Sequence, residues 1–188
     1  MRRHCVGTVL ALASVLQAST SNGMTAKSAD GLVDSIGINT HLNHTDTAYS
    51  AVDSVVLPRL DELGVRHLRD HMYEDRPALE ELEKRLVARG KRFMLITQID
   101  MTPQGISGWI NRLGPAAVSA VEGPNEYDLF GGATWAQQLQ DHTRMLWSVI
   151  KTDPLLRNIT VAGPSPVSYT HLRAHETKAN LVCRLLLE

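Results

Sequence analysis

The sequence predicts an α/β fold in which about five parallel strands alternate with helices. Short apolar runs rich in β-branched residues alternate with longer segments whose apolar residues recur at helical spacing. The connections are short, which favours right-handed crossovers between parallel strands. Polar residues follow successive strands, at His41, Asp70, Gln98 and Glu126. Because the strand ends of a parallel barrel carry its active face, this pattern also indicates where a site would lie.

The first two strands are each followed by a helix. Residues 36–41 are rich in β-branched side chains and end in polar groups, as expected for a strand. Helical spacing follows over residues 48–63, where Pro58 should kink or divide the helix. Residues 65–69 form the second expected strand, and Pro77 opens the second helix. Glycines stand where these two helices should end, at Gly64 and Gly90.

Three more strands continue the pattern. Residues 93–97 are a nearly continuous apolar run, as expected for a strand covered on both faces. A third helix is expected at residues 103–113, and the fourth strand at residues 118–122. The fourth helix should span about residues 134–151, and the fifth strand residues 158–162.

Two architectures fit this alternation, an open doubly wound sheet or part of a TIM (β/α)8 barrel. No Gly-x-Gly-x-x-Gly sequence follows the first expected strand, which disfavours a dinucleotide-binding sheet. The segment that carries the pattern, residues 31–166, is well short of the roughly 250 residues of a closed barrel. We therefore expect a partial TIM barrel, truncated after about five strands.

Both ends of the chain are expected to lie outside this fold. Residues 1–18 join Arg2-Arg3 to an apolar run, which predicts a signal peptide and a secreted or periplasmic protein; a buried helix is the alternative. Residues 19–30 form a polar lead-in. Residues 167–188 resemble the translation of a common sequencing-library adapter, with a natural amphipathic helix as the alternative. We assign no function to this tail, which contains Cys183.

Charge, hydrophobic pattern and histidine spacing argue against several classes of function. The formal net charge is −1 and there is no basic run, which argues against a nucleic-acid partner. No membrane span is expected after signal cleavage. The spacing of the histidines matches no ligand template, so we expect neither a metal nor another cofactor. The histidines concerned are His41, His44, His67 and His71.

The candidate site is the Asn125-Glu126 pair, which follows the fourth expected strand after a bend at Gly123-Pro124. Glycoside cleavage needs an acid that protonates the leaving oxygen and, for retention, a second carboxylate about 5 Å away. Glu126 could be that acid if burial or a nearby charge, such as that of Glu122, raised its pKa. The amide of Asn125 could both donate to and accept from a sugar hydroxyl.

With these elements placed, the chain resembles the N-terminal half of a clan A glycoside hydrolase, a family of (β/α)8 barrels. Residues 36–41, 64–70, 121–126 and 161–164 carry the resemblance. It implies that Glu126 is the general acid/base, that Asn125 binds the sugar 2-hydroxyl and that Arg69 supports the catalytic carboxylates. The implied nucleophile is a second Glu after a seventh strand, so the chain as given should be an inactive fragment of an enzyme acting on oligo- or polysaccharides.

Each assignment has a structural alternative. Glu126 could be a solvated loop residue, Asn125 a turn residue, and Arg69 the partner of Asp70 or Glu74. Further candidates for contact with sugar are His41, Tyr127 and Trp135, although a Trp at a helix start is more often part of a core. The alternative function is a non-catalytic, secreted carbohydrate-binding or scaffolding barrel. An open-sheet α/β hydrolase is weaker, because no Gly-x-Ser-x-Gly elbow is present.

Overall fold

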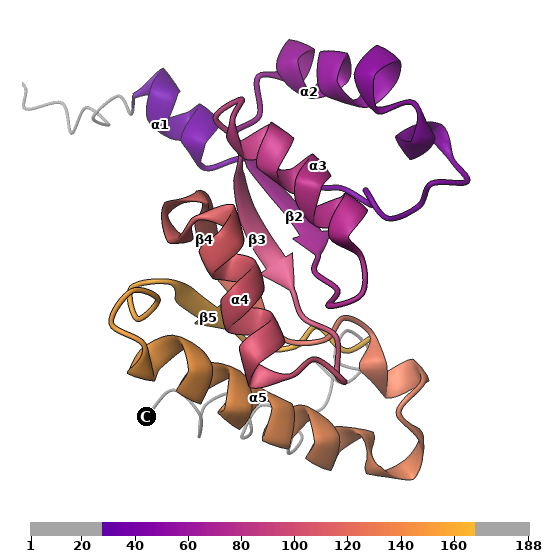
Figure 1. The fold of residues 1–188 in the computed structure, drawn as a ribbon, viewed down its shortest axis with the longest axis vertical. Coiled ribbons are helices and arrows are strands. Elements are labelled where there is room, and N and C mark those ends of the chain that lie inside the picture. Colours follow the sequence, from indigo (N-terminus) through magenta and orange to yellow (C-terminus); the bar gives the residue numbers. More distant parts are fainter. Residues whose placement is uncertain (1–27, 168–188) are drawn as a thin grey trace, which may run out of the picture.

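A computed structural model describes residues 28–167. Its five strands form one sheet of order β1-β2-β3-β4-β5, and every neighbouring pair is parallel. The strands are β1 (Gly37–Asn39), β2 (His67–His71), β3 (Arg92–Ile96), β4 (Val118–Glu122) and β5 (Thr160–Ala162). The predicted α/β fold with intervening helices is confirmed (Figure 1). Because strand order follows chain order without a reversal, right-handed crossovers place successive helices on one face, as in part of a barrel.

Five α-helices accompany these strands in residues 28–167. They are α1 (Ala29–Asp34), α2 (Leu57–Leu63), α3 (Pro77–Val87), α4 (Pro103–Leu113) and α5 (Trp135–Thr152). The helical segment predicted over residues 48–63 is divided near Pro58, as expected. A π-helical turn at Val52–Val56 comes first, and α2 follows it. Gly64 then ends α2 with a left-handed φ of 64°. Short 3-10 turns connect several elements, including Tyr127–Leu129 after β4.

The core lies between the sheet and the helices. Leu68 and Phe93 are in register on neighbouring strands and are almost fully buried on the helix side. From the helices, Leu86 and Trp109 complete this layer. Side chains alternate across a strand, so Arg69 points to the opposite face of the sheet. The sequence thus directs apolar residues towards the helices and polar ones towards the other face.

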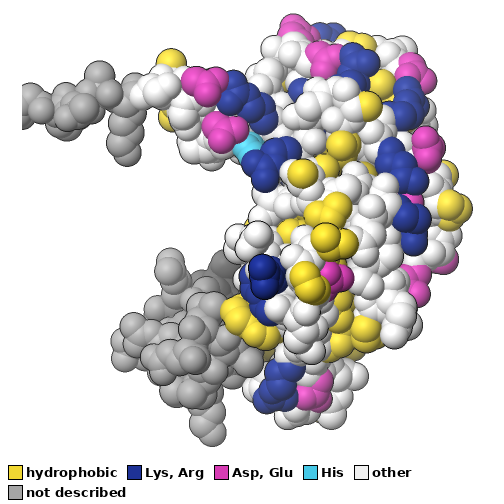
Figure 2. Space-filling model, turned by 60° about the vertical axis from the view of Figure 1, so that its left-hand side comes forward, with side chains coloured by type: hydrophobic (Ala, Val, Ile, Leu, Met, Phe, Trp, Pro, Cys, Tyr) yellow, Lys and Arg dark blue, Asp and Glu magenta, His cyan; other side chains and the backbone are white. Residues whose placement is uncertain are grey.

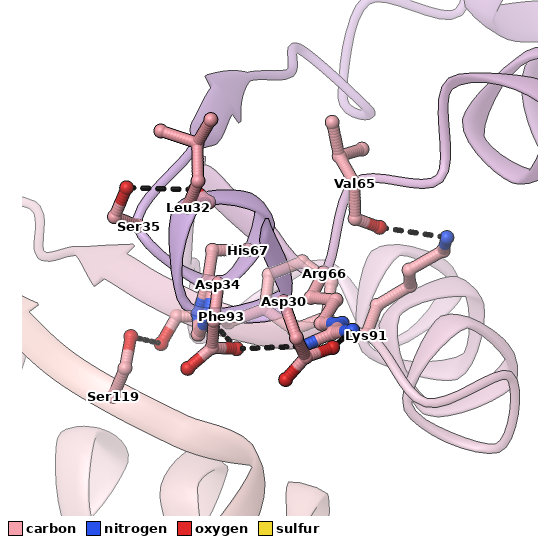
Figure 3. A network of polar contacts seen from close by, with 10 residues as sticks. All are labelled: Asp30, Leu32, Asp34, Ser35, Val65, Arg66, His67, Lys91, Phe93 and Ser119. Carbon is pink, nitrogen blue, oxygen red and sulfur yellow. Dashed lines mark hydrogen bonds and ion pairs between the residues drawn. The ribbon is translucent and has the colours of Figure 1, made fainter. Parts of the chain in front are cut away.

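The first helix, α1, was not predicted; it begins at Ala29, near the end of the segment expected as a polar lead-in, and runs to Asp34. Ser28 caps α1 by accepting a hydrogen bond from Gly31 N, and no residue of the helix is buried. Asp30 and Asp34 on α1 instead pair with Arg66, and His67 Nε2 lies 3.0 Å from Asp34 Oδ1 (Figure 3). Polar contacts at the start of β2 therefore hold α1 in place.

Charged and apolar side chains occupy different parts of the surface around α1. Figure 2 shows acidic and basic side chains side by side at the base of α1, and apolar side chains on the hollowed surface below it. No helix within residues 28–167 is long and apolar enough to cross a membrane. The predicted signal peptide and nearly all of the adapter-like tail lie outside the described residues.

Candidate active site

The loop after β4 is anchored to the chain that follows β5. Glu126 N donates to Ser165 O at 2.9 Å, and Asn125 and Ser165 form an isolated parallel bridge. Gly123 allows the loop after β4 to lie this close to the chain after β5. A Cβ at Gly123 would lie 3.1 Å from Pro164 N and 3.2 Å from Pro164 Cα. The bend at Gly123 thus fixes where Asn125 and Glu126 stand at the carboxyl end of the sheet.

Glu126 has an uncommon backbone conformation. Its φ of 55° and ψ of 23° lie in the left-handed region, and it is the only non-glycine with positive φ in the described chain. This conformation costs a residue with a Cβ about 1 to 2 kcal/mol. The side chain is exposed and makes no hydrogen bond or ion pair within residues 28–167. Such strain is typical of functional sites, where the surrounding structure maintains it.

Arg69 binds Glu122 through two nitrogens. Its Nε donates to Glu122 Oε2 at 2.7 Å, and its Nη2 donates to Glu122 Oε1 at 2.6 Å. Ser165 Oγ donates to Glu122 Oε1 at 2.5 Å. Only 4% of the Glu122 side chain is exposed, against 24% of Arg69. The predicted alternatives for the partner of Arg69, Asp70 and Glu74, are therefore wrong.

This pairing also corrects the role expected of Glu122. The sequence suggested Glu122 as a nearby charge that could raise the pKa of Glu126, but its carboxylate is paired with Arg69. Hydrogen bonding to Glu122 raises the pKa of Arg69 above its usual value, and the charge of Glu126 acts in the same direction. A charge effect of this kind requires that Glu126 lies near the guanidinium.

Arg69 also sets the orientation of the Asn125 amide. Its Nη2 donates to Asn125 Oδ1 at 3.0 Å. The amide oxygen is thereby occupied, and the two N–H donors of the amide are directed elsewhere. The structure thus brings together Arg69 from the middle of β2, Glu122 from the end of β4, and Asn125 and Glu126 from the loop that follows.

Asp70 faces away from this group. It is fully buried and accepts hydrogen bonds from Thr40 Oγ1 at 2.6 Å and from Leu42 N at 3.0 Å. It also accepts from His71 N at 2.7 Å. Asp70 therefore fixes the loop after β1 against β2, which makes it a positioning residue for His41 and the segment that follows.

The aromatic candidates after β4 are involved in internal packing. Tyr127 OH donates to Gln138 Oε1 at 2.9 Å, which ties the loop to α5. Trp135 is half-buried at the first position of α5. A Cβ at Gly131 would lie 2.5 Å from the Tyr127 ring and 2.7 Å from Trp135 Cβ, so the chain packs closely against both. Their contact with sugar stays a prediction.

The sequence did not identify Ser165, nor the pairing of His71 with Gln98. Ser165 anchors both the loop and Glu122, and its only signal was that a polar residue follows the fifth strand. His71 and Gln98 meet at the ends of β2 and β3, where Gln98 Nε2 lies 3.0 Å from His71 Nδ1. Within residues 28–167, no three His, Cys, Asp or Glu side chains are grouped so that they could hold a metal ion.

Comparison with protein-family models, curated proteins and solved structures found no match to this chain.

Proposed function

We propose that this chain carries the acid/base half of a retaining glycoside hydrolase active site, with Glu126 as the general acid/base. The observation that supports this most is that the exposed Glu126 directly follows Asn125, whose amide oxygen accepts a hydrogen bond from Arg69. Carboxyl ends of strands are where barrel enzymes hold their catalytic residues. The strained backbone of Glu126 is a second, independent support.

In the proposed reaction Glu126 acts twice. Its protonated carboxyl gives a proton to the glycosidic oxygen as the C–O bond breaks, while a second carboxylate attacks the anomeric carbon. The Glu126 carboxylate then takes a proton from the water that releases the sugar. We propose that the second carboxylate lies beyond these residues in the complete protein. Asn125 directs its free N–H donors towards a sugar hydroxyl, because Arg69 holds its oxygen.

The test uses the complete protein encoded by the gene that carries this sequence. We expect Glu126→Gln to lower kcat/KM for aryl glycosides about 100-fold or more, because general acid–base catalysis contributes factors of this size. Glu81→Gln on the exposed face of α3 is the matched control and should retain full turnover. An unchanged rate in Glu126→Gln would exclude Glu126 from the role. Sugar binding without turnover in the unaltered protein would instead favour a carbohydrate-binding barrel.

A further inference from the structure

Four rings form a row at the carboxyl ends of β1 and β2. The rings of His44 and His41 stack with centroids 4.8 Å apart and an interplanar angle of 18°. His41 and His71 follow at 6.4 Å, and His71 stacks on Tyr73 at 5.8 Å. The guanidinium of Arg76 lies over the Tyr73 ring at 4.3 Å from its centroid. This ring row thus combines three imidazoles with a cation at one end.

Hydrogen bonding fixes the middle of the ring row. The amide nitrogen of Gln98 can only donate, so His71 Nδ1 accepts from it at 3.0 Å. In the neutral ring the proton is then on Nε2, where it is available to a ligand. Burial lowers the pKa of His71, which keeps this ring neutral more readily than an exposed one. Asn43 Nδ2 donates to Tyr73 OH at 3.2 Å and holds the end of the row.

The exposed basic side chains of the ring row have no carboxylate partner in the described part of the chain. Within residues 28–167, no ion pair joins a carboxylate to His41, His44 or Arg76. Elsewhere on the surface many arginines meet carboxylates, namely Arg59, Arg66, Arg85, Arg89, Arg112 and Arg144.

The charged groups nearest the row do not supply the missing anion. Asp70 acts electrostatically on His71, but its oxygens accept from Thr40, Leu42 and the His71 backbone. Arg69, which also acts on His71, is held by Glu122. Asp75 and Asp70 act electrostatically on Tyr73, but within residues 28–167 neither Asp46 nor Asp75 forms an ion pair with a side chain of the row. The row is therefore a place where protonated imidazoles would attract an anion.

We propose that the ring row binds the carboxylate of an acidic sugar unit, a uronate, next to the sugar held by Asn125 and Glu126. This proposal rests on the proposed glycoside-hydrolase function. At the usual strand spacing, His71 on β2 lies about 10 Å from the end of β4, and His41, which follows β1, lies about 14 Å from it. These distances suit a nearby unit of the same sugar chain. Acidic polysaccharides are thus the proposed substrate class.

The test measures binding, without turnover, by affinity electrophoresis of the 188-residue chain. The gels contain pectate, alginate or hyaluronan as acidic polymers, and galactan, xylan or β-glucan as neutral ones. We expect at least one acidic polymer to retard the chain several-fold more at about pH 5.5 than at about pH 8, because imidazole protonation falls over this interval. Neutral polymers should show no such dependence on pH.

Two variants and a matched control locate the effect. His41→Gln and His44→Gln should each lose most of the retardation, whereas His67→Gln at the opposite end of β2 should keep it. The proposal is wrong if no acidic polymer retards the chain more than the neutral ones, or if His67→Gln loses as much as the other two. Because this measurement needs no catalysis, its outcome is separate from that of the Glu126 substitution.

Discussion

At Glu126 the backbone adopts a conformation that glycine would adopt at lower cost. Ser165 O and the close approach of Gly123 to Pro164 hold the loop in this geometry. Under the proposed function, this cost places a carboxylate at the position of the general acid/base. Strain and proposed function are thus located in the same residue.

We predict that Glu126→Gly leaves the chain as stable as before or stabilises it by up to about 1 kcal/mol. The relief of about 1 to 2 kcal/mol in the left-handed region exceeds the added entropy cost of glycine, about 0.5 to 1 kcal/mol. Glu81→Gly within α3 is the control and should lose about 1 kcal/mol. Urea unfolding measures both variants. Equal losses in the two would show that the conformation of Glu126 is not strained.

Asn125 and Glu126 were identified because they follow an apolar run, which can be read from local pattern, whereas Arg69 was named from the resemblance to clan A glycoside hydrolases. The sequence did not pair Arg69 with Glu122, which lies 53 residues away. Ser165 lies 43 residues from Glu122 and was missed for the same reason. Local spacing contains no information on such distant partners, and the register of the parallel strands supplies it.

Between α3 and α4 one carboxyl group is buried with incomplete hydrogen bonding. Trp109 Nε1 donates to Glu83 Oε2 at 2.8 Å, while Glu83 Oε1 has no partner within the described residues. Burial raises the pKa of Glu83 well above its usual value, against the effect of the Trp109 bond. Glu80, one turn earlier, is the opposite case, because hydrogen bonding to Arg112 lowers its pKa.

These two carboxyl groups should give opposite dependences of stability on pH. Glu83 has a folded pKa above its unfolded value, so its contribution is complete below about pH 4.5 and is lost as pH rises towards the folded pKa. Glu80 has a lowered folded pKa, so its contribution is present above its unfolded pKa and is lost as pH falls.

Accordingly, we expect Glu83→Gln to remove the loss of stability that sets in as pH rises above about 4.5, and so to raise the urea midpoint at neutral pH relative to the parent. Glu80→Gln should lower the midpoint at neutral pH and change it less in acid. Urea titrations at several pH values measure the midpoints of both variants and of the parent. A Glu83→Gln variant whose midpoint falls in parallel with that of Glu80→Gln would refute the assignment.

Individual elements were predicted unequally well. The bounds of α4 and β4 match the prediction residue for residue, because Pro103 and Gly114 mark α4 and a dense apolar run marks β4. β5 is shorter than predicted, beginning at Thr160. α1 was not predicted, since its six residues bury none of their apolar side chains and show no core-facing periodicity.

The whole sheet has two unpaired edges in the described chain. β1 pairs with β2 alone, and β5 pairs with β4 alone. Strand edges of this kind can add further strands from other chains.

The alternation of helix and strand was sufficient to predict one parallel sheet. The order of the strands came only from the structure, because barrels and doubly wound sheets show the same alternation.

We predict that the 188-residue chain self-associates through these edges as its concentration rises. Thr160→Lys places a charge on the exposed edge strand β5 and should shift the chain towards monomer. Ser148→Lys on the exposed surface of α5 adds the same charge away from any edge and should not. Sedimentation velocity measures all three proteins. Equal association in the two lysine variants would rule out the edge.

The most direct measurement is azide rescue of Glu126→Ala in the complete protein, using an aryl glycoside whose leaving group needs no protonation. Without a carboxylate at Glu126 the sugar–enzyme intermediate forms, but water is not activated to release it. Azide needs no general base, so we predict that it restores turnover and yields a glycosyl azide of retained configuration. If azide neither accelerates turnover nor appears in the product, Glu126 is not the acid/base.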